Sequence, residues 1–343
     1  MNAASHHLPP DNVQWFPISE KKIARRTSPT NIGLYLCACV SACTFGFIDA
    51  RGLRERLDAA YAELIQLRRY KGHFYNWYDL NSGEVIGVPY ISTVDSGNFA
   101  CALICAAQGA GAHVQDDAGL ARTAKKMYQL AREMDFSFLY HRQANQLHLG
   151  YDTETQTLSS SRYDLYASEI RSAVYFAIAM GQIPACAWEH LGKPMTEGRG
   201  HIGIASWTGS AFEYFMPALW MPTPANSVSA EMLAYAFEAQ NADGMLLKTD
   251  TGEMPLFGKS EGAYFGFDRE SNFQYQPYGV PSLAQCSDMK RQTLCMPYAL
   301  YLMLPFAPQT VRGALDAAGS IGMSGPYGLY EALDATSDRV GGG

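Results

Sequence analysis

Helices that are apolar on every face alternate along this chain with helices that carry one polar face. An all-apolar helix must be covered on all sides, whereas an amphipathic helix can lie with one side in water. In each of five successive pairs the more apolar member comes first: 28–48 and 51–70, 98–109 and 118–134, 165–180 and 183–191, 211–220 and 230–240, and 293–304 and 309–318. The alternation predicts an all-α fold built as a double-layered helical toroid, with the apolar helices in the inner layer.

The composition favours one large domain over two domains joined by a linker. Of the 343 residues 48% are hydrophobic and 17% are charged, and no stretch rich in Gly, Ser or Pro divides the chain. We therefore expect residues 1–26 to form a polar lead-in and residues 27–343 to form a single domain. The net charge of −7 argues against a nucleic-acid partner, because phosphate binding requires clustered Lys and Arg.

An uncharged run from residue 27 to residue 48 follows the basic sequence KKIARR, which is the pattern of a membrane anchor. Its strongly apolar part, residues 32–48, is shorter than the ~20 residues that a bilayer requires. A buried helix with Ser28 as N-cap and Pro29 as its first residue is the favoured interpretation. No stable membrane insertion is therefore expected.

The cysteines lie mostly inside the apolar stretches. None forms a CxxC pair or a Cys/His cluster with the spacing of a zinc site, so neither a metal nor another cofactor is predicted. Buried free thiols are typical of a reducing compartment, and we expect a cytoplasmic protein. The sequence does not indicate an oligomeric state.

The third apolar helix, predicted over residues 165–180, contains a carboxylate. Its charged residues are Glu169 and Arg171, and nearly all the others are apolar. Burial of an ionised carboxylate costs several kcal/mol even after relaxation. Glu169 is therefore either a paired core residue, with Arg171 as one candidate partner for a carboxylate, or a working group that lines a wet cavity.

The connections between the helices carry aromatic side chains mixed with amides and carboxylates, most densely in HFYNWYD at residues 73–79. Aromatic faces stack on the apolar faces of pyranose rings, while amides and carboxylates bind hydroxyl groups. Structural alternatives are core capping for the aromatic residues, N-capping for Asp95 and a helix-dipole role for Glu213. The candidate sugar-binding residues are Tyr75, Asn76, Trp77, Asp79, Asp95, Asn98, Tyr163, Asp164, Trp207, Glu213, Tyr264, Gln274 and Tyr275.

Glu261 lies between small residues in GKSEGAY, so a ligand could approach it closely; the alternative is a solvated loop carboxylate. Two carboxylates surrounded by aromatic and amide groups suit glycosidic bond chemistry. One protonates the leaving oxygen, and the other attacks the anomeric carbon or activates water. A Ser/His/Asp hydrolase is disfavoured, because no GxSxG motif is present and the histidines are scattered.

Several motifs together resemble one known family. They are RTSPTNIGLYL, GHFYNWYDL, STVDSGN, MDFSFLY, YDLYASEIR, SWTGSAFEYFMP, GKSEGAY, FQYQPYGVP and GPYGLYEALD, in this order between about Arg26 and Asp334. The set resembles the glucoamylase-like domain of cyclic β-1,2-glucan synthases, which is glycoside hydrolase family 189. It is more distantly similar to the β-1,2-glucanases of family 144.

The resemblance implies an (α/α)6 barrel that acts on a β-1,2-glucan oligosaccharide or polysaccharide. In the synthases this domain cleaves linear glucan and rejoins it as a ring, with retention of configuration. Glu169 of YDLYASE matches the acid/base glutamate of the family, and Glu261 of KSEGAY matches its nucleophile. Further helices follow the YEALD segment in the family, so a barrel lacking its last helix is expected here.

Two other functions remain open at this point. The first is a non-catalytic glucan-binding or assembly module, a remnant of a larger glucan synthase. The second is an unrelated helical toroid that acts on another polysaccharide.

Overall fold

The computed structural model describes residues 7–14, 21–198, 201–249, 252–286 and 292–336. The chain forms two compact units. Unit 1 comprises Met1–Asp164 and Ile170–Leu191, and unit 2 comprises Leu165–Glu169 and Gly192–Gly343. Residues 165–169 therefore belong to unit 2, although the segments on both sides of them belong to unit 1.

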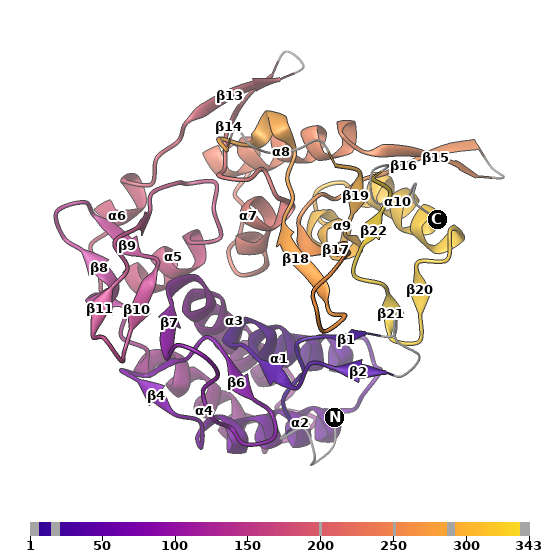
Figure 1. Ribbon diagram of the computed structural model, residues 1–343. Helices are drawn as coiled ribbons and strands as arrows, with labels where there is room; N and C mark the ends of the chain where they lie inside the picture. Colours follow the sequence, from indigo (N-terminus) through magenta and orange to yellow (C-terminus); the bar gives the residue numbers. More distant parts are fainter. Residues whose placement is uncertain (1–6, 15–20, 199–200, 250–251, 287–291, 337–343) are drawn as a thin grey trace. The chain divides into compact units, whose positions relative to one another are not determined.

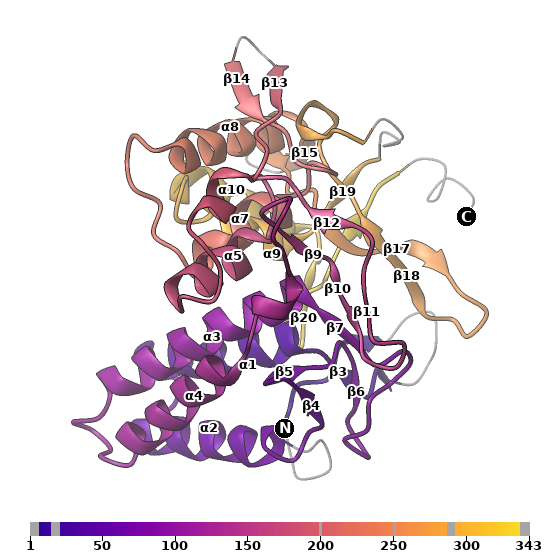
Figure 2. The ribbon, with the colours of Figure 1, turned by 90° about the vertical axis from the view of Figure 1, so that its left-hand side faces the viewer.

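Six α-helices are described in unit 1, and three of them begin at capping side chains. Four of them, α1 to α4, lie side by side in Figures 1 and 2. The N-caps of α1, α2 and α3 are Ser28, Asp49 and Ser92, and each accepts a hydrogen bond from a backbone N–H three residues further on. Such caps satisfy N–H groups that a helix start leaves unpaired. The helices described in this unit are α1 (Pro29–Thr44), α2 (Ala50–Leu64), α3 (Thr93–Ala112), α4 (Leu120–Glu133), α5 (Arg171–Ala179) and α6 (Cys186–Glu189).

Glycines allow α3 to approach its neighbours closely. A Cβ atom added to Gly33 of α1 would lie 2.7 Å from the Cβ of Ala102, and one added to Gly97 of α3 would lie 2.5 Å from the Cβ of Ala173. Both distances are far below ordinary van der Waals contact. The crossings of α3 with α1 and with α5 therefore depend on residues without side chains.

Short antiparallel ladders connect the helices of unit 1. The paired strands are β1 with β2, β3 with β6, and β4 with β5; β10 pairs with both β7 and β11, and β9 pairs with both β8 and β12. Their bounds are β1 (Val13–Gln14), β2 (Lys22–Ile23), β3 (Arg26–Thr27), β4 (Arg69–Tyr70), β5 (His73–Phe74), β6 (Tyr78–Asp79), β7 (Tyr90–Ser92), β8 (Tyr140–His141), β9 (Gln146–His148), β10 (Gly150–Asp152), β11 (Thr157–Leu158) and β12 (Arg162–Tyr163). A 3-10 helix, η2 (Ser137–Leu139), precedes β8.

Unit 2 combines helices with longer hairpins. Its helices are α7 (Ala211–Phe215), η3 (Met216–Leu219), α8 (Val228–Ala242), η4 (Pro281–Leu283), α9 (Pro297–Met303) and α10 (Pro308–Ser320). Its antiparallel pairs are β13 (Met195–Gly198) with β14 (His201–Ile204), β15 (Met245–Thr249) with β16 (Gly252–Leu256), β17 (Glu261–Phe267) with β18 (Phe273–Pro277), β19 (Leu294–Cys295) with β22 (Leu333–Asp334), and β20 (Ser324–Gly325) with β21 (Gly328–Leu329).

The helices occur in the predicted order, but two expectations about their surroundings are wrong. The helix expected from residue 165 begins only at Arg171, because Leu165 and Ala167 form parallel bridges with Gly192 and Ser206. The long connections also contain antiparallel pairs of strands, which the all-α prediction did not include. The all-α prediction is therefore confirmed for the helices and is wrong for the long connections between them.

The predicted N-terminal helix is α1, with Ser28 and Pro29 in the expected capping positions. Among the residues that the structure describes, no helix is both long enough and apolar enough to cross a membrane. The eight cysteines are free thiols, and Cys39, Cys43, Cys101 and Cys295 are buried.

Candidate functional site

Glu169 lies in an irregular segment of unit 2 and not inside a helix. The two bridges at Leu165 and Ala167 hold the chain before it, and Glu169 itself is in a turn. The Ser168 hydroxyl donates a hydrogen bond to Oε2 of Glu169 at 3.2 Å. Because Glu169 is only half-buried, it does not carry the full desolvation cost that a core carboxylate would.

A buried loop, residues 206–210, lies next to this segment and is organised by Glu213. The Glu213 carboxylate accepts hydrogen bonds from the hydroxyls of Ser206 and Thr208 at 2.8 and 2.7 Å and from the backbone N–H of Ser210 at 3.0 Å. Ser210 and Glu213 also form a capping box at the start of α7. These donors compensate the burial of the charge, so in the structure Glu213 shapes the loop.

Glu261 is the first residue of β17, and the backbone around it is fixed by two hydroxyls. The Phe212 N–H donates to Oγ of Ser260 at 3.0 Å, and Oη of Tyr298 lies 2.7 Å from Ser260 Oγ and 2.7 Å from the carbonyl oxygen of Glu261. One hydroxyl carries one proton, so the chain of bonds runs from Ser260 to Tyr298 to the Glu261 carbonyl. Burial raises the pKa of Tyr298, which keeps this donor protonated.

Gln240 of α8 holds the backbone of Lys259, which directly precedes Ser260. The Gln240 side chain is 1% exposed; Nε2 donates to the carbonyl oxygen of Lys259 at 2.9 Å, and Oε1 accepts from the Lys259 N–H at 2.8 Å. The Ala211 N–H binds the same Lys259 carbonyl oxygen at 2.9 Å. The ammonium group of Lys259 is also buried and forms an ion pair with Asp243.

The two glutamates are therefore attached to one framework within unit 2. At one end of the buried loop Ser206 pairs with Ala167, two residues before Glu169. At the other end, the first turn of α7 binds Ser260, directly before Glu261. Two carboxylates on separate segments, held by a shared hydrogen-bonded loop, are the groups that hydrolysis of a glycosidic bond requires.

Four predicted sugar ligands of unit 2 lie on the same or adjoining segments. Trp207 of the buried loop is 59% exposed, and Tyr275 of β18 is 62% exposed. Tyr264 and Gln274 face each other across β17 and β18, and the Tyr264 hydroxyl donates to Oε1 of Gln274. The two rings expose surface on which a sugar could stack, and Tyr264 and Gln274 bind each other.

The aromatic cluster at residues 73–79 belongs to unit 1 and is largely structural. Tyr75 is 1% exposed, and its hydroxyl accepts a hydrogen bond from Thr153. The indole of Trp77 lies under the guanidinium group of Arg26 at 4.6 Å, and Asn76 is half-buried next to it. The Asp79 carboxylate binds the N–H groups of its own turn, which lower its pKa.

Asp95 and Asn98, also in unit 1, lie in the first turns of α3. The N-cap of this helix is Ser92 and not Asp95; the Asp95 carboxylate instead accepts a hydrogen bond from the Thr30 hydroxyl at 2.5 Å. Burial raises the pKa of Asp95. Oδ1 of Asn98 is buried and has no hydrogen-bond partner among the described residues. By exposed surface Asp95 is half-buried, whereas Asn98 is buried.

The last two predicted ligands of unit 1 are Tyr163, the second residue of β12, and Asp164, which follows it. Tyr163 pairs with Leu147 of β9 and is half-buried, and Asp164 is exposed. Asp164 is the residue after which the chain enters unit 2.

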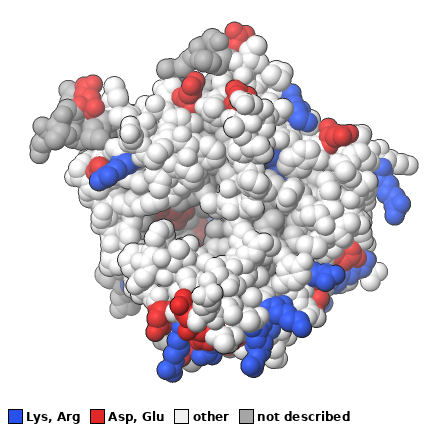
Figure 3. Space-filling view, turned by 180° about the vertical axis from the view of Figure 1, so that it is seen from behind, with Lys and Arg blue, Asp and Glu red and all other residues white. Residues whose placement is uncertain are grey.

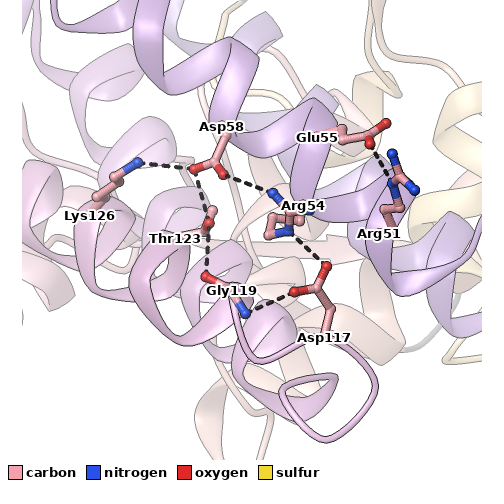
Figure 4. Close-up of polar contacts among 8 residues, drawn as sticks. All are labelled: Arg51, Arg54, Glu55, Asp58, Asp117, Gly119, Thr123 and Lys126. Carbon is pink, nitrogen blue, oxygen red and sulfur yellow. Dashed lines mark hydrogen bonds and ion pairs between the residues drawn. The ribbon is translucent and has the colours of Figure 1, made fainter.

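A surface cleft of about 240 Å³ beside α2 and α4 lies away from all the predicted residues. Its lining includes Tyr61, Ile65, Leu130, Glu133 and four basic residues, Arg69, Arg122, Lys125 and Lys126. Lys126 pairs with Asp58 at 3.1 Å, next to the pair of Arg54 with Asp117 at 2.7 Å (Figure 4). On the face seen in Figure 3, basic and acidic side chains are interspersed. Within the described residues, no group of three or more His, Cys, Asp or Glu could hold a metal ion.

No protein-family model matches this sequence. It is 27% identical, over an alignment of 462 residues, to the cyclic β-(1,2)-glucan synthase NdvB of Rhizobium meliloti (strain 1021). The resemblance predicted from the sequence is confirmed. The alignment covers 99% of this chain and 16% of the synthase, so the chain spans less than a fifth of that relative. Because the alignment is longer than the 343 residues here, the matched region of the synthase contains segments that this chain lacks.

Solved structures of β-1,2-glucanases have a similar fold. The endo-β-1,2-glucanase of Talaromyces funiculosus in complex with sophorose has a TM-score of 0.74 at 13% identity and matches 98% of this chain and 78% of its own. The endo-β-1,2-glucanase of Chitinophaga pinensis, with sophorotriose and glucose, has a TM-score of 0.71 at 15% identity and matches 94% of this chain and 79% of its own. At such identities the comparison establishes the fold alone.

Sequence reasoning missed Gln240, Lys259 and Tyr298 of this framework, and it also missed Glu331, whose Oε1 accepts a hydrogen bond from the Ala263 N–H at 3.0 Å. The positions of Gln240 and Tyr298 were the signal that could have found them, because each is a polar side chain on an apolar face and must find a buried partner. Lys259 was in view within the GKSEGAY motif, but its ion pair with Asp243 depends on a distant helix end. Nothing local to the YEALD segment indicated where Glu331 would lie.

Proposed function

We propose that this chain is a glycoside hydrolase or transglycosylase that acts on β-1,2-glucan through Glu169 and Glu261. The observation that carries the proposal is that both glutamates lie in unit 2 and are attached to the same buried loop. Homology to a β-1,2-glucan synthase and the fold of β-1,2-glucanases support the choice of substrate. The exposed rings of Trp207 and Tyr275 would serve as sugar platforms.

In this mechanism Glu261 attacks the anomeric carbon while Glu169 gives its proton to the glycosidic oxygen. The bond to the leaving chain breaks, and a glycosyl ester of Glu261 forms. Glu169 then removes a proton from the acceptor, which attacks the ester and frees Glu261. Water as acceptor yields a shorter chain, a 2-hydroxyl of another chain yields a longer one, and a 2-hydroxyl of the same chain yields a ring.

The wider setting of the site is part of the same proposal. Residues 27–343 would form one catalytic domain with the (α/α)6 architecture, and the protein would work in the cytoplasm. The five helix pairs found in the predicted order support this architecture.

The test is incubation of the protein with linear β-1,2-glucan, with the products separated by chromatography and weighed by mass spectrometry. A ring weighs one water less than the linear chain of equal length, so the two outcomes are distinct. Glu169→Gln and Glu261→Gln should each lower kcat by roughly 100-fold or more. The matched control is Glu253→Gln, which changes an exposed glutamate of β16 in the same unit and should retain the parent activity. Unchanged substrate with the parent protein, or full activity of Glu169→Gln, would refute the proposal.

A non-catalytic glucan-binding or assembly module is the second candidate. It is favoured by the exposed rings of Trp207 and Tyr275, on which a glucan could stack without turnover. This candidate predicts that calorimetry detects β-1,2-glucan binding, that both glutamine variants bind as well as the parent, and that none of the three turns the glucan over.

A further inference from the structure

A third carboxylate lies against the strand that begins with Glu261. Oε1 of Glu331 accepts a hydrogen bond from the backbone N–H of Ala263 at 3.0 Å, and Oδ2 of Asp334 accepts one from the N–H of Phe265 at 3.0 Å. Alternate N–H groups of a strand point to the same side. One edge of β17 therefore pairs with β18, and these two carboxylates bind N–H groups of the other edge, where β22 runs in Figure 1.

Glu331 binds the strand two residues after Glu261, and the residue between these two positions, Gly262, has no side chain. Ala263 follows Glu261 by two residues, a distance of about 7 Å along a strand. A Cβ atom at Gly262 would lie 3.6 Å from Oε1 of Glu331 and 3.1 Å from Cγ of Met296. The Glu331 carboxylate therefore lies beside the first three residues of β17.

The Tyr298 hydroxyl interacts electrostatically with both Glu261 and Glu331. This hydroxyl lies 2.7 Å from the carbonyl oxygen of Glu261. Burial is the main cause of the raised pKa of Tyr298, and the negative charges of both Glu261 and Glu331 add to it. The charges of both carboxylates thus act on this one hydroxyl.

We propose that Glu331 is a positioning residue for Glu261: it holds the first residues of β17 in place and puts a second negative charge beside the nucleophile. A like charge disfavours ionisation, so Glu331 raises the affinity of Glu261 for a proton and sets the pH range in which Glu261 can react. Because Glu331 is exposed, water screens its charge and the effect is moderate. This inference rests on the proposed role of Glu261.

Three variants separate the charge of Glu331 from its hydrogen bond. Glu331→Gln keeps an oxygen that can accept from Ala263 and removes the charge, whereas Glu331→Ala removes both. Asp334→Asn is the matched control, because it neutralises the same kind of contact two residues further from Glu261.

The primary measurement is the titration of the Glu261 carboxyl by carbon-13 NMR, with its signal assigned by its loss in Glu261→Gln. In Glu331→Gln the pKa of Glu261 should fall by roughly half a unit to one unit. In Asp334→Asn it should fall by less than half as much. Glu331→Gln leaving this pKa unchanged, or Asp334→Asn lowering it equally, would overturn the proposal.

The second measurement is the pH profile of kcat/KM on β-1,2-glucan. The limb that Glu261 controls should move to lower pH in Glu331→Gln by the same amount as in the titration. Glu331→Ala should in addition lower kcat, and Glu331→Gln should retain it. A purely structural Glu331 would lower activity without moving the limb, which would also overturn the proposal.

The two measurements keep the inference apart from the proposed function. A parent protein without turnover refutes the proposed function, while the NMR titration still decides whether Glu331 acts on Glu261. If the parent is active but the pKa of Glu261 is the same in the parent and in Glu331→Gln, only this inference is refuted.

Discussion

Replacing Gly97 of α3 with alanine tests how closely two helices of unit 1 approach. The new Cβ atom would lie 2.5 Å from the Cβ of Ala173, 2.7 Å from its Cα and 2.7 Å from its backbone nitrogen. Carbon atoms in good contact are about 3.5–4.0 Å apart, so α5 must move by about 1 Å. Two of the three atoms belong to the backbone, and no change of rotamer can relieve the overlap.

The expected magnitude is a difference of two opposing terms. Alanine is favoured over glycine in a helix by about 0.8–1.0 kcal/mol. Overpacking of a well-packed core costs about 1–3 kcal/mol, and a backbone clash belongs at the upper end of that range. Gly97→Ala should therefore lower the free energy of unfolding by roughly 1–2 kcal/mol.

The matched control is Gly111→Ala in the same helix, where no atom lies within 4 Å of the added Cβ. This variant gains helix propensity only, so it should be as stable as the parent or more stable by up to about 1 kcal/mol. Urea unfolding followed by far-UV circular dichroism measures both. Equal stability of Gly97→Ala and the parent, or equal destabilisation by both changes, would show that the helix contact is not as close as the structure has it.

Three other outcomes follow from buried groups. Burial lowers the pKa of His73 from 6.5 to about 4. Its contribution to the free energy of unfolding is therefore fully present above pH ~6.5 and is lost as the pH falls toward ~4. The parent should lose about 3 kcal/mol over that range in urea titrations, and His73→Phe should flatten this dependence. Gln240→Leu removes both hydrogen bonds to Lys259 and should lower kcat on β-1,2-glucan while unfolding studies report a loss of about 2–4 kcal/mol. Gly279→Ala would place a Cβ 1.8 Å from the carbonyl oxygen of Thr208, and thermal melts should show a loss of stability that the control Gly319→Ala does not share.

The sequence by itself determined the number and order of the main helices and several of their starts. Periodicity and capping act over three or four residues, so their energies are readable in a local window. Ser28 with Pro29 is one such start, and Ala211 is another. The motifs around Glu169 and Glu261 were also legible, because each is a short run of neighbouring residues.

Only the tertiary structure decided what surrounds those motifs. Residues 165–170 have the composition of a helix, but Ala167 is bound by Ser206, which lies 39 positions further along the chain. The contact of Ala263 with Glu331 likewise joins residues 68 positions apart. Such pairings depend on where remote segments pack, and no local pattern encodes that energy. The sequence thus indicated Glu169 and Glu261 as candidates, while the contacts of the buried loop and of Glu331 were determined by tertiary packing.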